Sequence, residues 1–460
     1  MSVTTEKEPK KPNLLTGVKG MNDILPVQAA AWEGLEETLR VWLHSYGYRN
    51  MRTPVLEHTA LFARGIGEVT DIVEKEMFCF TDRLNGDELT LRPEFTAGVV
   101  RAVAEHNLLE FRGEQFSQPQ RLYSYGPVFR HERPQKGRYR QFHQLSVEAI
   151  GFAGPDVDAE IIVMLARLWE ELGLSQIRLE LNCLGDLAER QAHREALITY
   201  FTAHADQLDA DAQRRLHSNP LRILDSKNPA LQSLLEAAPR LSDFLGPASL
   251  AHFQTLQRYL KQAGIAYTLN PRLVRGLDYY NLTVFEWVTD QLGAQGTVCG
   301  GGRYDGLMAT LAGKQAPAIG FGIGIERLLL LLESIGGIEP SAGCDLYIVH
   351  QASDAYQAEV ALRAFAVAEE LRGLGFAVVL HCGGGNFKAQ MKKADASGAH
   401  YALIIGDNEW LSETVTLKSL RAGGSAADNG VQSDGRPVQQ TVALAELARV
   451  LSEQLYDQPD

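Results

Sequence analysis

A segment rich in glycine, proline and serine at residues 335–343 separates two stretches that differ in their pattern of apolar residues. This composition is typical of a linker. Before it, short β-prone segments follow one another with only occasional helices, which predicts an antiparallel sheet and an α+β domain. After it, strands alternate with helices, which predicts a small α/β domain with a largely parallel sheet. The 460 residues, 45% of them hydrophobic, are enough for two to four domains.

The first stretch contains helices with a clear apolar period at residues 27–46, 156–172 and 324–334. The β-prone segments between them are residues 77–81, 88–92, 121–129, 145–150, 283–287 and 296–299. Residues 184–262 differ, because they are rich in Ala, Leu, Gln and Arg at helical spacing and contain few β-branched residues. They predict a helical insertion within the first domain.

The second stretch begins with a regular alternation of elements. Its pattern predicts strands at residues 345–350, 377–381 and 401–405, separated by helices at 355–374 and 387–397. The polar start of the chain lacks an apolar core and predicts a disordered tail, not a signal peptide. We therefore expect a tail at residues 1–16, a first domain at 17–335, a linker at 336–343 and a second domain at 344–460.

Charge and cysteine content exclude several classes of protein. A net charge of −13 argues against indiscriminate nucleic-acid binding, although it permits a local basic patch. The five cysteines are scattered without a CxxC pair, so neither a disulfide framework nor a zinc ribbon is indicated. No apolar run is long enough for a membrane span. These features predict a cytoplasmic protein that does not bind membranes.

The densest chemical signal is a basic hairpin at residues 129–144. It contains five cations and one acid: Arg130, Arg133, Lys136, Arg138, Arg140 and Glu132. Pro134 and Gly137 favour a turn, so the flanking segments are expected to pair as strands. Guanidinium groups bind phosphate oxygens in pairs, and the rings of Tyr139 and Phe142 are suited to stacking on a base. The alternative interpretation is a solvated charged hairpin.

Three further segments combine glycine with charged or phenolic groups. Residues 273–280 read as a buried strand carrying Arg275, an aspartate and two tyrosines, which is costly unless these groups serve each other or a ligand. Residues 300–306 permit close backbone approach but lack the Lys-Ser/Thr of a phosphate loop, and a plain bulged turn is an equal alternative. Residues 318–327 read as a glycine-rich strand running into a helix whose first turn carries Glu326 and Arg327.

Together these segments resemble the class II aminoacyl-tRNA synthetases. Leu91-Arg-Pro-Glu94 with Thr96, the segment 129–133 and Gly322-x-Gly-x-Glu-Arg327 are similar to elements of that class. Arg275-Gly-Leu-Asp-Tyr-Tyr280 and residues 301–306 resemble two signatures of its histidine-specific family. Residues 20–26 and Pro54 are similar to that family's N-terminal segment and to the class II dimer motif. The resemblance covers the chain from about Gly17 to its C-terminus.

The resemblance implies an activity and site roles. The activity is formation of histidyl-adenylate and pyrophosphate from L-histidine and ATP, followed by transfer of histidine to tRNA(His) by a homodimer. Catalytic roles are implied for Arg130, Arg275 and Arg327. ATP would be held by Arg130, Glu132, Phe142 and Arg327, with Mg²⁺ accompanying ATP and no metal motif in the protein. Histidine would be held by Glu94, Thr96, Gln144, Glu148, Arg275, Tyr279, Tyr280 and Tyr304.

For RNA, the resemblance implies a helical insertion near the acceptor stem and a C-terminal anticodon-binding domain. Contacts with tRNA would come from Arg133, Gln135, Lys136, Lys388 and Lys392, with Lys393 nearby. The sequence departs from the family pattern at Phe95 and at Ser146-Val147, which flank the amino-acid contacts. We expect Phe95 to point into the core.

Two alternatives compete with this interpretation. One is the non-catalytic synthetase-like subunit that regulates ATP phosphoribosyltransferase in histidine biosynthesis, which is expected to lack the C-terminal domain and catalytic arginines. The other is a class II synthetase for a different amino acid.

Overall fold

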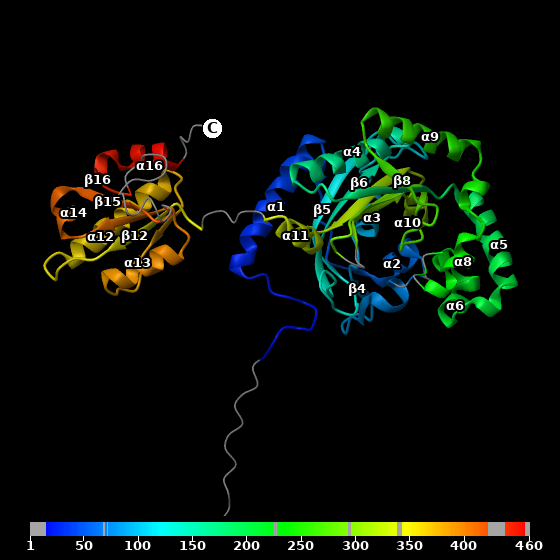
Figure 1. The fold of residues 1–460 in the computed structure, drawn as a ribbon, viewed down its shortest axis with the longest axis horizontal. Helices are drawn as coiled ribbons and strands as arrows, with labels where there is room; N and C mark the ends of the chain where they lie inside the picture. Colours follow the sequence, from blue (N-terminus) through cyan, green and yellow to red (C-terminus); the bar gives the residue numbers. More distant parts are fainter. Residues whose placement is uncertain are drawn as a thin grey trace, which may run out of the picture. The chain divides into compact units, whose positions relative to one another are not determined.

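The computed structural model describes residues 15–67, 70, 72–224, 226, 228–292, 296–337, 343–421 and 438–455. The chain forms two compact units, Met1–Ile338 and Glu339–Asp460, each with its own sheet (Figure 1). Most of the predicted tail and of the predicted linker lies outside the described residues. Among the described helices, none combines the length and apolar content that a membrane span requires.

An eight-stranded sheet forms the centre of the first unit. Its order is β1 (Arg49–Asn50), β5 (Gln120–Phe129), β6 (Gln141–Ile150), β11 (Ala318–Gly324), β10 (Thr297–Arg303), β9 (Asn281–Val288), β7 (Arg178–Cys183) and β8 (Tyr267–Leu269). All neighbouring strands run antiparallel except the edge pairs β1–β5 and β7–β8. The predicted α+β domain with an antiparallel sheet is therefore confirmed, and residues 129–141 connect β5 and β6 as the predicted hairpin.

Alternate strand residues face two different layers of helices. One face packs against α1 (Pro26–Ser45), α4 (Pro155–Glu171), α9 (Pro247–Gln262) and α11 (Ile325–Ser334). Leu35, Leu39 and Leu43 fall on one side of α1 and are buried there, and Trp42 donates from Nε1 to the carbonyl of Met164 in α4 (3.0 Å). The other face packs against α3 (Thr96–Glu105) and α10 (Leu307–Ala312), beside α2 (Thr59–Ile66).

Smaller elements surround these helices. A three-stranded sheet pairs β2 (Leu56–His58), β4 (Glu88–Leu91) and β3 (Phe78–Thr81), and a π-helical turn η1 covers Ile72–Glu76.

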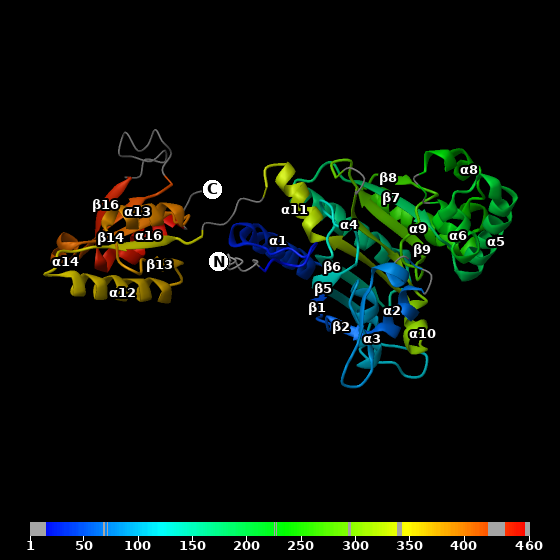
Figure 2. The ribbon, with the colours of Figure 1, turned by 90° about the horizontal axis from the view of Figure 1, so that it is seen from below.

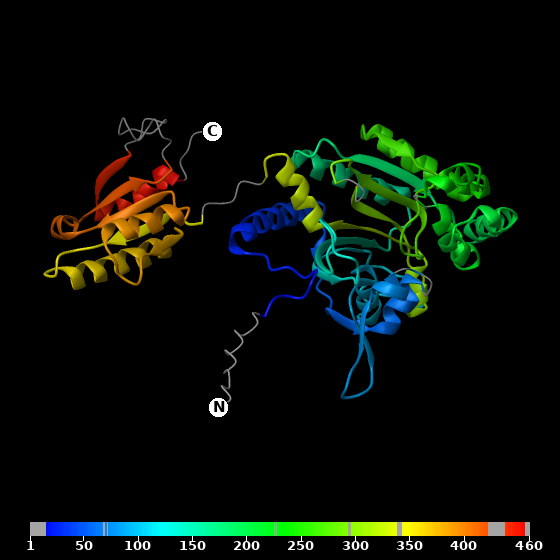
Figure 3. The same ribbon diagram turned by 60° about the horizontal axis from the view of Figure 1, so that its bottom comes forward.

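The predicted helical insertion contains two kinds of helix. The helices α5 (Leu187–Ala203), α6 (Ala210–Ser218), α7 (Leu221–Leu224) and α8 (Gln232–Glu236) surround an apolar cluster of their own, with short 3₁₀ turns at Ala205–Gln207, Pro229–Leu231 and Leu241–Phe244. They lie at the side of the sheet away from α1 (Figures 2 and 3). In contrast, α9 contributes Leu256 and Leu260 to the main core. The helices with a separate core are therefore those before α9.

The second unit has a five-stranded sheet in the order β13 (Val378–Leu380), β12 (Leu346–His350), β14 (Tyr401–Ile405), β15 (Thr414–Ser419) and β16 (Gln439–Ala443). Its helices are α12 (Gln357–Gly373), α13 (Phe387–Ala396), α14 (Asp407–Ser412) and α16 (Leu447–Leu455), with a 3₁₀ turn at Leu444–Glu446. The prediction of a largely parallel sheet is wrong for half of it, because β15 and β16 pair antiparallel. Antiparallel neighbours need no helical crossover, so the βαβ pattern did not reveal them.

Candidate active site

A cavity of about 260 Å³ opens above the centre of the large sheet. Its walls come from β6, β10, β11, the hairpin after β5, the segment before β9 and the starts of α3 and α11. It brings together most of the predicted site residues: Glu94, Thr96, Arg130, Glu132, Phe142, Gln144, Arg275, Tyr279, Tyr280, Tyr304 and Arg327. The exposed Arg133, Gln135 and Lys136 do not line it, and Lys388 and Lys392 belong to the second unit.

Glycines in β10 and β11 form the floor of this cavity. A Cβ on Gly300 would lie 2.5 Å from the guanidinium of Arg275, and one on Gly320 would lie 2.0 Å from Oε2 of Glu148. A Cβ on Gly322 would lie 2.3 Å from Nε2 of Gln144. The glycines therefore allow functional side chains to lie directly on the backbone of the sheet. Residues 300–306 are partly strand and partly turn: Gly300–Gly302 lie within β10, its pairing with β9 shifts register between Gly302 and Arg303, and a turn follows at residues 305–306.

The segment predicted as a buried strand at residues 273–280 is an irregular loop between β8 and β9. The strand prediction was wrong because the polar groups of this segment bind residues of other elements instead of belonging to a strand paired in a sheet. Arg275 forms an ion pair with Glu286 of β9, whose other oxygen accepts from Thr297 Oγ1 (2.9 Å). Burial opposes the charged form of Arg275, but Glu286, Tyr279 and Tyr280 together outweigh burial, so the pKa of the guanidinium is raised. Glu286 thus fixes Arg275.

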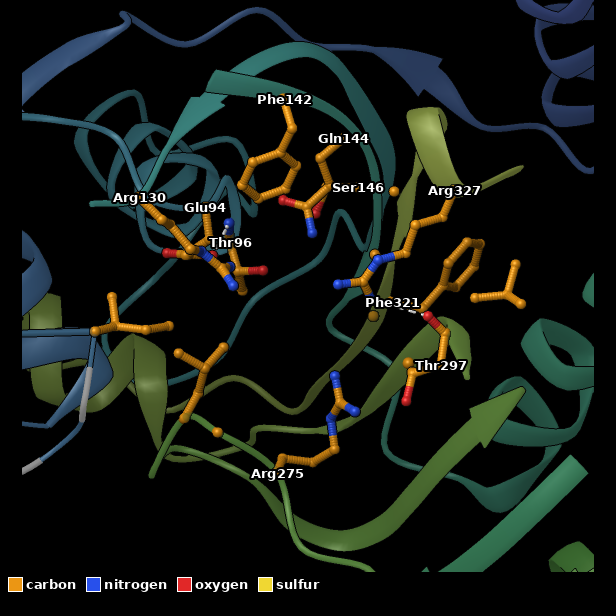
Figure 4. A pocket seen from close by; sticks show the side chains of 18 of the residues that line it. Glu94, Thr96, Arg130, Phe142, Gln144, Ser146, Arg275, Thr297, Phe321 and Arg327 are labelled. Carbon is orange, nitrogen blue, oxygen red and sulfur yellow. Dashed lines mark hydrogen bonds between the residues drawn. The ribbon is translucent and has the colours of Figure 1, made fainter. Parts of the chain in front are cut away.

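Backbone carbonyls orient the other two arginines. Arg130 donates from Nε to Pro93 O (2.9 Å), and its guanidinium lies 5.5 Å from the centre of the Phe142 ring. Arg327 donates to Gly137 O and to Thr297 O, both at 3.0 Å. Burial lowers the pKa of both groups. The guanidinium groups of Arg130, Arg275 and Arg327 point into the cavity from three sides (Figure 4).

A group of phenols lines the cavity beside a buried carboxylate, Glu148, which is not itself among the lining residues. Glu148 lies under Gly320 and is 1% exposed. It accepts from Thr96 Oγ1 (2.7 Å), from Ser146 Oγ (2.8 Å) and from the Tyr304 hydroxyl. Burial raises the pKa of Glu148 to about 7. The rings of Tyr280 and Tyr304 lie 4.6 and 5.6 Å from that of Tyr279, so the three phenols form one cluster.

Glu94 is held at the N-terminus of α3. Its carboxylate accepts from the backbone N–H groups of Thr96 (2.5 Å) and Ala97 (2.9 Å), and burial raises its pKa. Phe95 is 1% exposed, does not line the cavity, and lies under the Arg92 guanidinium at 4.2 Å. The prediction that Phe95 points into the core is confirmed, although it begins a helix and is not part of a strand.

Several lining residues had no role predicted from the sequence. Ser146 donates to Glu148, and Arg138 of the basic hairpin pairs with Glu132. Glu326 accepts from the backbone N–H (2.9 Å) and from Nδ1 (3.0 Å) of His143. The only signal in the sequence for a role of Glu326 was its position beside Arg327. Among the described residues, no three His, Cys, Asp or Glu side chains are grouped to hold a metal.

Comparisons with known proteins identify the family of the chain. A family model described as histidyl-tRNA synthetase matches residues 20–328, and a model described as an anticodon binding domain matches residues 346–454. A histidine–tRNA ligase of Bordetella avium is 61% identical over 95% of this chain and 97% of its own length. Another, of Thiobacillus denitrificans, is 64% identical over 88% of this chain and 94% of its own length.

Solved structures give the same result. Apo histidyl-tRNA synthetase from S. aureus aligns with a TM-score of 0.76 and 35% identity, covering 95% of this chain and 100% of that one. A Bacillus halodurans structure titled ATP phosphoribosyltransferase regulatory subunit/histidyl-tRNA synthetase aligns with a TM-score of 0.58 and 25% identity, covering 83% and 97%. The predicted resemblance is thus confirmed by the family model and by relatives that match nearly end to end: the chain belongs to the histidyl-tRNA synthetase family.

Proposed function

We propose that this chain activates L-histidine with ATP and transfers it to tRNA(His). The observation that carries the proposal is the cavity itself: three guanidinium groups point into it, and phenols line it, one of which, Tyr304, donates to the carboxylate of Glu148 buried beneath Gly320. The guanidinium groups suit the phosphates of ATP. The phenols and the carboxylate suit a small, aromatic side chain that both donates and accepts hydrogen bonds, as imidazole does.

The chemistry needs no covalent enzyme intermediate. A carboxylate oxygen of histidine attacks the α-phosphorus of ATP, the bond to the β-phosphate oxygen breaks, and pyrophosphate leaves with its electron pair. Arg130 and Arg275 neutralise the charge that develops at the α-phosphate, and Arg327 holds the γ-phosphate. Phe142 and Glu132 hold the adenine. The protein thus positions two anions that repel each other.

Selection of histidine follows from polar groups placed to bind its imidazole and its α-ammonium group. Glu148 and Tyr280, with Tyr279 and Tyr304, read the imidazole, while Glu94, Thr96 and Gln144 bind the α-ammonium group. An apolar amino acid would form no hydrogen bonds with these groups, which gives discrimination of roughly 10⁴-fold or more. The buried Oε1 of Gln144 has no hydrogen-bond partner within the described structure, which supports a ligand contact there.

Mg²⁺ is expected to accompany ATP. Since the described residues form no metal-ligand cluster, the ion would be held mainly by phosphate oxygens, as Mg²⁺ often is in nucleotide sites. A homodimer and a cytoplasmic location stay predictions.

The test is amino-acid-dependent exchange of pyrophosphate into ATP, with each of the twenty amino acids. We expect rapid exchange with histidine alone. Comparable exchange with glycine, threonine or proline would contradict the assignment. Folded protein that binds ATP but exchanges with no amino acid would favour the regulatory subunit. Against that alternative stand a second unit that matches an anticodon-binding domain and the presence of all three arginines.

The second unit supplies the proposed anticodon contacts. Lys388 and Lys392 lie one turn apart on α13, and both are exposed, as is Lys393. Replacing Lys388 and Lys392 together by alanine should leave exchange unchanged and flatten the salt dependence of tRNA binding by roughly 0.7–0.9 log units for each phosphate that is no longer neutralised. Arg449→Ala removes an exposed cation from α16 of the same unit and is the control. An unchanged salt dependence of tRNA binding in the double variant would show that α13 does not contribute to the RNA interface.

A further inference from the structure

The loop that carries the proposed histidine-reading tyrosines is held by the helical insertion. Residues 275–280 lie outside any strand, and one backbone hydrogen bond, from the N–H of Asp278 to Ile66 O (3.0 Å), joins them to α2. Arg190 of α5 donates from Nη1 to the carbonyl oxygens of Asp278 (3.2 Å) and Tyr280 (2.6 Å). One guanidinium nitrogen therefore spans Tyr279 and binds the backbone on both sides of it.

Further hydrogen bonds join the insertion to this loop and to the start of β9, which follows it. Asn219, at the end of α6, donates from Nδ2 to Oδ1 of Asp278 (3.2 Å). Beyond the tyrosines, Leu282 donates to Gly185 O (2.8 Å) and accepts from the N–H of Leu184 (2.6 Å). Leu282 has a φ of +45°, which a leucine rarely adopts and which the surrounding contacts must impose.

The insertion can hold the loop in place because its helices pack together as one body. Its helices surround a separate apolar cluster that includes Leu197, Phe201 and Leu235. The start of α5 is fixed by Glu189, which accepts from the N–H of Asp186 (2.7 Å), from Gly246 N (2.6 Å) and from Ser249 Oγ (2.6 Å). Arg190 follows directly, so its side chain leaves a rigid part of the helix.

We propose that Arg190 is a positioning residue for histidine, through which the insertion sets the placement of Tyr279 and Tyr280. It touches neither substrate and acts through the loop. The inference rests on the proposed function, because it requires these tyrosines to bind the amino acid. The loop also carries Arg275, but the Arg275–Glu286 ion pair holds that side chain to β9 independently. Loss of Arg190 should therefore affect histidine binding more than ATP binding.

The test measures Michaelis constants for histidine and for ATP by pyrophosphate exchange in the full chain. Arg190→Ala should raise KM for histidine by about tenfold or more, as expected when hydrogen bonds from a charged group are removed. KM for ATP should change by less than about twofold. A uniform loss of active protein would instead lower kcat and leave KM for histidine and KM for ATP both unchanged. Arg190→Lys keeps the charge and a donor and should recover part of the loss.

Arg194→Ala is the matched control, because Arg194 lies one turn further along α5 and donates to His217 O within the insertion. It should have parent-like constants. Wild-type KM for histidine in Arg190→Ala, or equal changes for both substrates, would overturn the inference. So would an equal effect of Arg194→Ala. If Arg190→Ala does not fold, Arg190→Lys and Asn219→Ala replace it, and parent-like histidine constants in both would overturn it. Absence of histidine-dependent exchange in the parent would instead refute the proposed function.

Discussion

The arginines of the site and its buried carboxylate are held in different ways. Arg130 and Arg327, proposed to bind phosphate, are oriented by backbone carbonyls and Arg275 by one carboxylate, so cationic groups face the cavity. Glu148, proposed to bind histidine, is surrounded by three hydroxyl donors and pressed against Gly320. In the proposed reaction the arginines stabilise charge that appears during the reaction, whereas the surroundings of Glu148 are shaped before the substrate arrives. Substitutions in these two groups should therefore change different kinetic constants.

Arg275→Ala should have the largest effect. Loss of a group that stabilises the developing charge should lower kcat for exchange at least about a hundredfold, or about 2.7 kcal/mol. KM for ATP should change much less. Near-normal turnover with only a raised KM for ATP would place Arg275 in ground-state binding instead.

Gly320→Ala should act on the groups proposed to bind histidine. Its Cβ would lie 2.0 Å from Glu148 Oε2 and 2.5 Å from the carbonyl of Val147. Overpacking costs roughly 1–3 kcal/mol, so KM for histidine should rise by about thirtyfold. Gly324→Ala is the control on the same strand, because its Cβ would meet nothing closer than Arg327 at 3.9 Å. An equal rise in KM for histidine in both variants would argue that the space above Gly320 does not limit histidine binding.

Glu148→Gln should separate binding from stability. KM for histidine should rise about tenfold, since a charged acceptor is removed. Burial raises the pKa of Glu148 to about 7, above its unfolded value, so the folded state binds the proton more tightly. The parent therefore loses stability as pH rises toward about 7, on the order of 3 kcal/mol in total.

The glutamine variant lacks this loss and should gain stability relative to the parent between pH 5 and pH 8. Thermal unfolding at both pH values measures the difference. A constant difference would show that Glu148 does not titrate in this range.

Ser146→Ala should have the smallest effect. It removes one of three donors to Glu148, and a hydrogen bond of about 1 kcal/mol corresponds to about a fivefold rise in KM for histidine. Ser124 is its cross-strand partner, equally buried, and donates to Met51 O, outside the cavity lining. Ser124→Ala should therefore change stability without changing KM, and a similar KM for both variants would contradict the role of Ser146.

Sequence reasoning predicted what depends on local pattern. The helices α1 and α4, the β5–β6 hairpin and the two-part organisation follow from apolar spacing and turn residues. It failed where distant partners decide the structure. Residues 273–280 have the apolar content of a strand, but Arg275 pairs with Glu286 and Asp278 is bound by Arg190 and Asn219.

The contact of Glu326 with His143 joins positions 183 residues apart, which no local period can reveal. The residues gathered in the cavity were found through family motifs, whereas the hydrogen bonds that orient them required the structure.

The glycine floor limits how this pocket can evolve. No residue is smaller than glycine, so every substitution at Gly300, Gly320 or Gly322 adds atoms where a side chain already lies. Residues of the cavity walls can be replaced by larger or smaller side chains, whereas the floor glycines can only be replaced by larger ones. A lineage that changes its amino-acid preference must therefore begin at the walls, and random mutagenesis should recover altered specificity there while finding only loss of function at these three positions.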